Sequence, residues 1–296
     1  MSEILVANLI DWSKSFVDEN GTFYCGTTEE QKKRAVDVVN EADLVIYEAD
    51  LHPVFADEFS INKGLYPAHN LPKPWEYEPD FVYNIAPNGE NQKLGDKTLS
   101  PQLTETIREC LKKRKTGIIV PKEVYYQGGV EKAFCKPEDI EKTFEAKIIT
   151  SDQFYHAIGY HDYIIAPKKY FDATRLDSDM MLPKKVDEGI PSVNYNVFSL
   201  LKQKWLTFPL DYKMTFVNTG VVEGICRLHT SIGLKQMYPK SRVINLTDAT
   251  TPLSGIGLGY ETAEQSRDAC TRVCKDIGVE YMSTDEFLKE YGGRRE

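Results

Sequence analysis

The chain has 296 residues, six cysteines, five histidines and a formal net charge of −9, and 41% of its residues are hydrophobic. This composition is typical of a globular protein of one or two domains, and the acidic balance argues against nucleic acids and anionic membranes as main partners. No apolar run reaches the roughly 18 residues of a membrane span, and residues 1–3 lack the basic region of a secretory signal. We therefore expect a cytoplasmic protein whose cysteines are thiols.

Buried strands and amphipathic helices alternate at both ends of the chain. The N-terminal part predicts a strand at 4–12, a helix at 28–40 that begins with Thr-Glu-Glu, and a strand at 42–47. The middle predicts a loop at 67–95, a helix at 103–114, strands at 116–120 and 163–166, a loop at 172–191 and a helix at 195–204. The C-terminal part predicts strands at 213–218, 241–246 and 279–282 and helices at 226–237, 261–277 and 283–291.

This alternation of buried strands and helices favours parallel strands with helices on both faces. We therefore predict a three-layer α/β/α domain with a central parallel β-sheet. In such a sheet, ligands bind beyond the carboxyl ends of the strands. The chemically active side chains that follow predicted strands are those of Asp11, Asp50, His52, Cys226 and a lysine, Lys122 or Lys168. Their convergence indicates an active site more strongly than any one of them does.

Cys226 follows a predicted strand and a turn with two glycines, Gly220 and Gly224, at the start of a helix. The positive end of a helix lowers the pKa of a thiol and favours the nucleophilic thiolate. The glycines would let the backbone approach a substrate and direct N–H groups at an oxyanion. The alternative is a buried cysteine that acts as a small apolar side chain, which is the more usual role.

Asp11 and a lysine could assist such a thiol. A carboxylate at the end of the first strand could accept the thiol proton and later deliver it to a leaving amine, although aspartates also cap turns. An ammonium group would stabilise the thiolate by charge pairing. Lys122 and Lys168 both lie just past a short apolar strand, within Ile-Ile-Val-Pro-Lys and Ile-Ile-Ala-Pro-Lys, so local sequence leaves both open.

Asp50 and His52 lie two residues apart after a strand and could face one ion, with His69 as a second imidazole. Carboxylate and imidazole together suit Zn²⁺, Fe²⁺ or Mn²⁺. Glu58 and Asn62 lie between these residues and could add an oxygen ligand. A lone Asp-x-His match is also common in polar loops, so this metal site is the weaker hypothesis.

Taken together, these motifs resemble the isochorismatase-like cysteine hydrolases and, within them, the nicotinamidases. Residues 8–12 with Phe16 resemble the family's first strand, its catalytic aspartate and an aromatic residue that flanks the substrate. Residues 47–52 and 57–60 resemble its metal loop, and 65–70 resemble its later metal histidine. The stretch 220–226 resembles the nucleophile turn.

The resemblance implies roles for individual residues. Asp11, Lys168 and Cys226 would be catalytic, and the N–H groups of Val222 and Cys226 would form the oxyanion hole. Phe16 and Tyr66 would flank the substrate. The ligands of one divalent transition metal, zinc foremost and iron or manganese otherwise, would be Asp50, His52 and His69. A cis peptide bond would join Val221 to Val222.

The resemblance covers about residues 1–70 and 210–290. Because members of the family are shorter, we expect a single domain over 1–296 with an inserted subregion at about 72–160. Residues 162–173, followed by Leu176 and Asp177, match the family's Asp-strand-Lys run better than the region of Lys122 does. We therefore assign the lysine role to Lys168, with Lys122 as the alternative.

The expected activity is that of a cysteine-dependent amidohydrolase, foremost a nicotinamidase that converts nicotinamide to nicotinate and ammonia in NAD salvage. The alternatives are another C–N hydrolase that acts on a ureido or aliphatic amide, and an inactive binding protein with the same fold. A true isochorismatase is disfavoured by Cys226. The expected partner is a small-molecule amide, and the sequence leaves the oligomeric state open, a homo-oligomer included.

Overall fold

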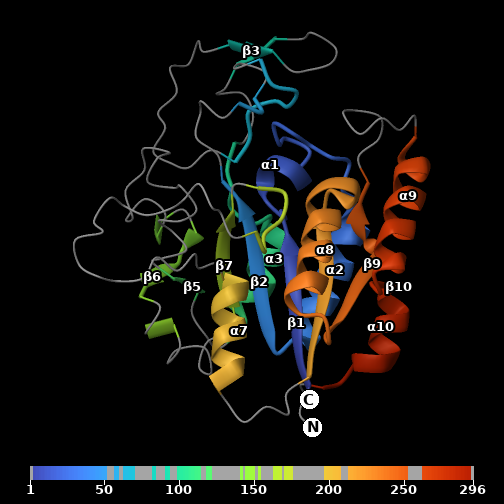
Figure 1. Cartoon of the computed structure of the whole chain (residues 1–296). Helices are drawn as coiled ribbons and strands as arrows, with labels where there is room; N and C mark the ends of the chain where they lie inside the picture. The colour runs from blue at the N-terminus through green and yellow to red at the C-terminus, as the bar shows by residue number, and fades with distance from the viewer. Residues whose placement is uncertain are drawn as a thin grey trace, which may run out of the picture.

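The computed structural model describes residues 3–51, 57–59, 63–70, 82–84, 91–93, 99–114, 118–121, 141–142, 144–150, 153–154, 163–168, 170–175, 197–207, 213–252 and 262–294. Its main sheet consists of β1 (Glu3–Ile10), β2 (Leu44–Asp50), β5 (Ile118–Pro121), β6 (Lys147–Ile149), β7 (Tyr163–Lys168), β8 (Lys213–Val221), β9 (Arg242–Thr251) and β10 (Glu280–Met282). The strand order is β10-β9-β8-β1-β2-β7-β5-β6, and every neighbouring pair is parallel (Figure 1).

Helices cover both faces of this sheet (Figure 1). They are α1 (Lys14–Val17), α2 (Glu29–Glu41), α3 (Glu105–Lys112), α7 (Val197–Thr207), α8 (Leu228–Met237), α9 (Ala263–Asp276) and α10 (Thr284–Tyr291). One core joins α2, α3 and α10 to the sheet, and a second core joins α7, α8 and α9 to it. Adjacent residues of β1 point to opposite cores, Leu5 to the first and Val6 to the second, which explains its continuous apolar sequence.

Capping residues begin the helices where the sequence predicts them. Thr28 and Gln31 form a capping box at α2, and Ser283 and Glu286 form another at α10. Each box satisfies backbone N–H groups that a helix leaves without partners at its N-terminus. The predicted three-layer architecture and central parallel sheet are confirmed.

Four local predictions were wrong. The stretch 67–95, expected as a loop, contains two antiparallel strands, β3 (Val82–Asn84) and β4 (Asn91–Lys93). The short elements α1 and β6 were missed, because three or four residues are too few to show a period. Strand β9 continues five residues past its predicted end, through polar residues, and pairs with β8 across a register shift. The helix predicted from residue 226 begins earlier, as a π-helix at Glu223–Arg227.

The expected insertion at 72–160 contains elements of the main fold. Strands β5 and β6 extend the sheet beyond β7, and α3 contributes Ile107 and Leu111 to the first core. The boundaries of an inserted subregion therefore stay a prediction. Within the described ranges no helix combines the length and the apolarity needed to cross a bilayer.

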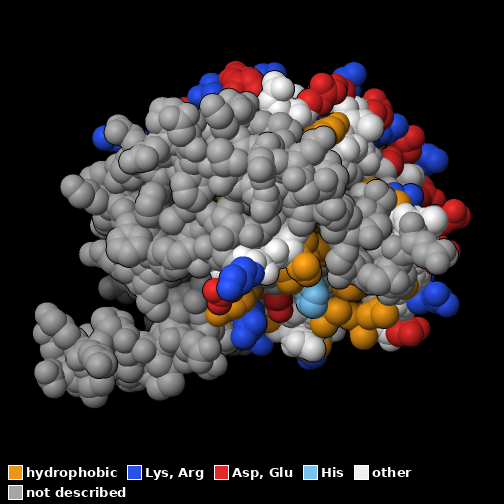
Figure 2. Space-filling view, turned by 90° about the horizontal axis from the view of Figure 1, so that it is seen from above, with side chains coloured by type: hydrophobic (Ala, Val, Ile, Leu, Met, Phe, Trp, Pro, Cys, Tyr) orange, Lys and Arg blue, Asp and Glu red, His pale blue; other side chains and the backbone are white. Residues whose placement is uncertain are grey.

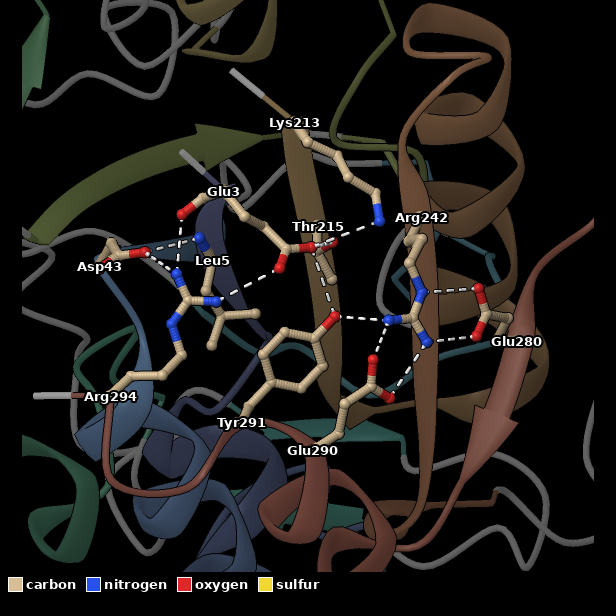
Figure 3. A network of polar contacts seen from close by, with 10 residues as sticks. All are labelled: Glu3, Leu5, Asp43, Lys213, Thr215, Arg242, Glu280, Glu290, Tyr291 and Arg294. Atoms are coloured by element: carbon tan, nitrogen blue, oxygen red, sulfur yellow. Dashed lines mark hydrogen bonds and ion pairs between the residues drawn. The ribbon is translucent and has the colours of Figure 1, made fainter. Parts of the chain in front are cut away.

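A polar network fastens the C-terminal elements to the amino ends of the strands (Figure 3). Arg242, at the start of β9, donates to the Glu280 carboxylate at 2.9 and 2.6 Å, and also to Glu290 and Tyr291. Arg294 donates to the backbone oxygen of Glu3 at 2.7 Å. We call these residues, with Asp43, Lys213 and Thr215, the amino-edge network.

Candidate active site

Asp11, Lys168 and Cys226 meet at the carboxyl edge of the sheet. Lys168 Nζ lies 2.9 Å from Asp11 Oδ2, 3.5 Å from Asp50 Oδ1 and 3.7 Å from Cys226 Sγ. All four residues are buried, and Cys226, the most exposed of them, is 8% exposed. One ammonium group therefore lies between a thiol and two carboxylates with little access to water.

Three adjacent strands hold these side chains in place. Asp11 directly follows β1 in a left-handed conformation, with φ of 52°. Its backbone N–H donates to Glu48 O at 3.1 Å, and its Oδ1 accepts the backbone N–H of Asp50 at 3.2 Å. Lys168 is the register partner of Asp50 on β7, and its carbonyl accepts the N–H of Leu51 at 2.9 Å. The carboxyl ends of β1, β2 and β7 thus place the cluster by main-chain hydrogen bonds.

The cysteine lies on the turn that follows β8. Gly220 has φ of +117°, and a Cβ there would lie 1.9 Å from Ile10 O, so only glycine fits between β8 and β1. The peptide bond between Val221 and Val222 is cis, as the resemblance implied. Cys226 then lies in the π-helix, which the buried ion pair of Glu223 and Arg227 spans at 2.5 Å.

Burial controls the protonation of the cluster. It raises the pKa of Cys226 well above that of an ordinary thiol, the charge of Asp11 raises it further, and Lys168 opposes the rise. This direction is opposite to the lowering expected from a helix N-terminus, because burial disfavours the charged thiolate. Burial also raises the pKa of Asp11 to about 6, although Lys168 lowers it. The pKa of Lys168 is lowered by burial but raised more by Asp11, Cys226 and Asp50, and lies well above its usual value.

The resting cluster is therefore a thiol beside a carboxylate and an ammonium group. At neutral pH, Asp11 with a pKa of about 6 is largely ionised and can accept a proton. The chemistry available is attack by sulfur coupled to proton transfer to Asp11, with Lys168 balancing the charge.

Aromatic side chains line an open pocket at Cys226, with about 370 Å³ of empty space when the space open to solvent is included. The ring centroids of Phe16 and His69 are 4.9 Å apart, and those of Phe23 and Tyr66 are 5.5 Å apart at an interplanar angle of 30°. Figure 2 looks down on this edge and shows hydrophobic side chains gathered beside a histidine and acidic groups in the described part of the surface. The pocket suits a small planar ring.

Asp50 and His69 have the donor chemistry of a transition-metal site. His69 Nε2 lies 3.3 Å from Asp50 Oδ2 and 3.3 Å from Glu58 Oε1. Two donors on one tetrahedral ion, each about 2.0–2.2 Å from it, lie roughly 3.3–3.6 Å apart, so each of these two pairs, taken alone, has a compatible spacing. His69 Nδ1 donates to Pro67 O at 2.7 Å, which directs Nε2 at the carboxylates, as outer partners do for metal-binding histidines.

These described donors do not complete a site by themselves. No group of three or more His, Cys, Asp or Glu side chains in the described ranges is arranged to hold an ion. Burial lowers the pKa of His69, but hydrogen bonds to Asp50 and Glu58 raise it more, to about 10, so a proton on Nε2 satisfies both carboxylates here. His52 and Asn62 lie outside the described residues, as does Lys122.

The structure thus brings together Asp11, Lys168, Cys226 and Val222 with Phe16, Tyr66, Asp50 and His69. Sequence reasoning missed Phe23 and Phe171 as pocket residues. It also missed Glu48, which is fully buried beside this cluster and accepts a hydrogen bond from Thr230 at 3.1 Å. Burial raises the pKa of Glu48 to about 8. The only sequence signal was an acidic residue inside a strand of otherwise apolar residues.

No protein-family model matches the chain, and no curated protein matches it by sequence. Solved structures do match. PnC1 from L. infantum in complex with nicotinate is 12% identical, with a TM-score of 0.50 over 96% of this chain and 96% of that one. The Acinetobacter baumanii nicotinamidase pyrazinamidease is 13% identical, with a TM-score of 0.49 over 97% and 100%.

An isochorismatase-like hydrolase from Alkaliphilus metalliredigens is 12% identical, with a TM-score of 0.49 over 97% of this chain and 99% of that one. At 12% identity and a TM-score of 0.50, the match to PnC1 shows the fold alone. The chain has the isochorismatase-like hydrolase fold that its motifs predict.

Proposed function

We propose that this protein is a cysteine-dependent amidohydrolase that converts nicotinamide to nicotinate and ammonia through a thioester. The observation that carries the proposal is the buried contact of Lys168 with both Asp11 and Cys226, at 2.9 and 3.7 Å, at the floor of an aromatic pocket. The fold match to PnC1, whose structure contains nicotinate, the product of this reaction, supports the same substrate class.

The first half of the reaction forms the thioester. As Cys226 Sγ attacks the carboxamide carbon, Asp11 accepts the thiol proton, and the N–H groups of Val222 and Cys226 stabilise the oxyanion. Asp11 then gives this proton to the nitrogen, and ammonia leaves. Lys168 stabilises the negative charge that moves between sulfur and carboxylate, which burial would otherwise disfavour.

The second half hydrolyses the thioester. A water molecule attacks the carbonyl carbon while Asp11 accepts its proton. The C–S bond breaks, the sulfur regains the proton, and nicotinate is released. Asp11 is suited to both halves because its pKa of about 6 lies near neutral pH, where it can accept and return a proton.

The aromatic side chains would hold the ring, with Phe16 and Tyr66 flanking it and Phe23 packed against Tyr66. Asp50, His52 and His69 would hold one divalent ion, with zinc preferred. When bound, such an ion would act as a Lewis acid toward the ring nitrogen. The residues of the chain itself would orient the carboxamide toward Cys226 and exclude water.

The decisive test is ammonia release from nicotinamide, pyrazinamide and several ureido and aliphatic amides, with Cys226→Ala and Cys110→Ala compared with the unaltered protein. Cys110 is a matched control because it is equally buried, at 8% exposed, and does not line the pocket. We expect turnover of the pyridine and pyrazine amides, abolished by Cys226→Ala and retained in Cys110→Ala.

The other outcomes assign the alternatives. Turnover of a ureido or aliphatic amide alone would indicate a different C–N hydrolase. Binding of nicotinamide without turnover would indicate a binding protein with this fold. Near-normal activity in a folded Cys226→Ala variant would refute the nucleophile.

A further inference from the structure

A second pocket lies on the face of the sheet that α3 covers. It is an open cleft between β2, β7, α3 and residues 144–145, with about 580 Å³ of empty space when the space open to solvent is included. It shares no lining residue with the pocket at Cys226. The proposed reaction therefore does not explain it.

The inner wall of this pocket is aromatic and apolar. Tyr47 and Phe144 pack edge to face, with ring centroids 6.3 Å apart, and Tyr163, Ile165 and Leu111 complete the wall. The Tyr47 hydroxyl donates to Pro101 O at 2.6 Å and is satisfied. A flat ring would find contacts on several sides here.

The Tyr163 hydroxyl is the unusual group on this wall. Tyr163 is 2% exposed, and its oxygen has no hydrogen-bond partner among the described residues. A buried hydroxyl without a partner is costly and normally has a reason. A ligand carrying a polar atom at its inner end would supply the missing partner.

Three cationic side chains, those of Arg108, Lys112 and Arg114, lie at the outer rim of the pocket together with Glu145. Arg108 is paired with Glu105 and Glu145, and Lys112 is paired with Glu109. The Arg108 and Lys112 side chains are 31% and 46% exposed, so solutes can reach them. Their ion pairs to acidic residues are at the surface, where such pairs are weak and exchange readily for an incoming anion. A ligand carboxylate could therefore replace one of these exposed partners on Arg108 or Lys112.

We propose that this second pocket binds a small aromatic carboxylate whose ring carries a hydrogen-bonding group opposite the carboxylate. The ring lies against Tyr47, Phe144 and Ile165. The carboxylate is held by Arg108 and Lys112 at the rim, and the polar group pairs with the Tyr163 hydroxyl. The site is separate from the proposed amidase chemistry and independent of it.

The ligand class is tested with three probes by isothermal titration calorimetry on the full chain. 4-Hydroxybenzoate has the ring, the anion and the inner polar group. Benzoate lacks the inner group, and 4-hydroxybenzyl alcohol lacks the anion. We expect saturable binding of one 4-hydroxybenzoate per chain, about fivefold weaker binding of benzoate, and the weakest binding of the alcohol.

The location of the site is tested with four variants. Tyr163→Phe removes one oxygen and should weaken 4-hydroxybenzoate binding about fivefold while leaving benzoate unchanged. Arg108→Gln should weaken both carboxylates about tenfold. Arg272→Gln, a surface arginine on α9, should change neither affinity. Phe23→Ala alters the pocket at Cys226 and should also leave binding unchanged.

Three results would overturn the proposal. One is no saturable binding of any probe to the folded chain. Another is binding that Phe23→Ala weakens and Tyr163→Phe does not, which would place the probe in the pocket at Cys226. The last is equal affinity for 4-hydroxybenzoate and 4-hydroxybenzyl alcohol, which would remove the role of the cationic rim.

Discussion

The two edges of the sheet both carry clusters of charged residues, but the clusters differ in balance and burial. In the amino-edge network Arg242 meets Glu280 and Glu290, whose side chains are 42% and 47% exposed (Figure 3). At the carboxyl edge Lys168 meets Asp11 and Asp50, whose side chains are 1% and 6% exposed.

The pKa shifts follow from this difference. Hydrogen bonds to Arg242 lower the pKa of Glu280 and Glu290, which favours the charged forms. Burial raises the pKa of Asp11 and Glu48, which favours the neutral forms. One edge therefore uses charge for stability, whereas the other holds groups that gain or lose protons readily. Perturbation of this second kind is typical of active sites.

The largest expected effect comes from Lys168, the central cation of the carboxyl-edge cluster. Lys168→Ala should reduce kcat/KM by at least about a hundredfold, because the buried negative charge loses its cation. It should also raise the pKa of Cys226 further, since Lys168 is the group that lowers it. The measurement is the pH dependence of alkylation by iodoacetamide, which should shift to higher pH.

The control for this prediction is a lysine of the other edge. Lys213, half exposed and 3.8 Å from Glu3, belongs to the amino-edge network. Lys213→Ala should leave both activity and the alkylation profile unchanged. Lys122→Ala should also leave the profile unchanged. A shift in the Lys122 variant with none in the Lys168 variant would reverse the lysine assignment.

The contrast between edges also explains what the sequence could predict. Strands β1, β2 and β8 are buried on both faces, so their apolar runs can be recognised in the sequence. Asp11 directly follows β1, Asp50 ends β2, and the nucleophile turn follows β8. The parallel order then brings these residues together.

Other features depend on long-range packing and leave no local pattern. Phe23 reaches the pocket from a turn of irregular structure, through contacts with Tyr66 and His69. The raised pKa of Cys226 depends on burial, which the position of a thiol before a helix does not reveal. Arg242 and Glu280 are 38 residues apart, and nothing in the local sequence links them. They meet because β10 pairs with β9 in the folded sheet.

The next effect concerns the metal hypothesis at the carboxyl edge. His69→Ala and His52→Ala should each strip a divalent metal and raise KM for a pyridine amide about tenfold or more, because each would remove a ligand. Elemental analysis of the purified protein and its variants gives the readout independently of activity. No stoichiometric transition metal in the unaltered protein, with activity insensitive to a chelator, would contradict the hypothesis.

A smaller effect is expected at the amino edge. Arg242→Ala should lower the free energy of unfolding by about 1–2 kcal/mol, because a partly exposed guanidinium loses hydrogen bonds to two carboxylates and a tyrosine. Urea denaturation measures this change. Because the network lies at the opposite edge from Cys226, kcat should stay the same, and a loss of kcat in the folded variant would show that the two edges are coupled.

The smallest effect is the pH dependence of this network. Because Arg242 lowers the folded pKa of Glu280 below its ordinary value of 4.5, the folded state binds fewer protons than the unfolded state in this range. The contribution of Glu280 to the free energy of unfolding is complete above about pH 4.5 and is lost as pH falls through the lowered folded pKa.

Glu280→Gln should therefore lower the free energy of unfolding by less than about 1 kcal/mol at pH 7, since the side chain is exposed and screened, and by progressively less below pH 4.5. Denaturation of both proteins between pH 3 and 7, at low and high salt, measures this. A stability difference that is constant over this range would show that Glu280 acts through packing and not through its charge.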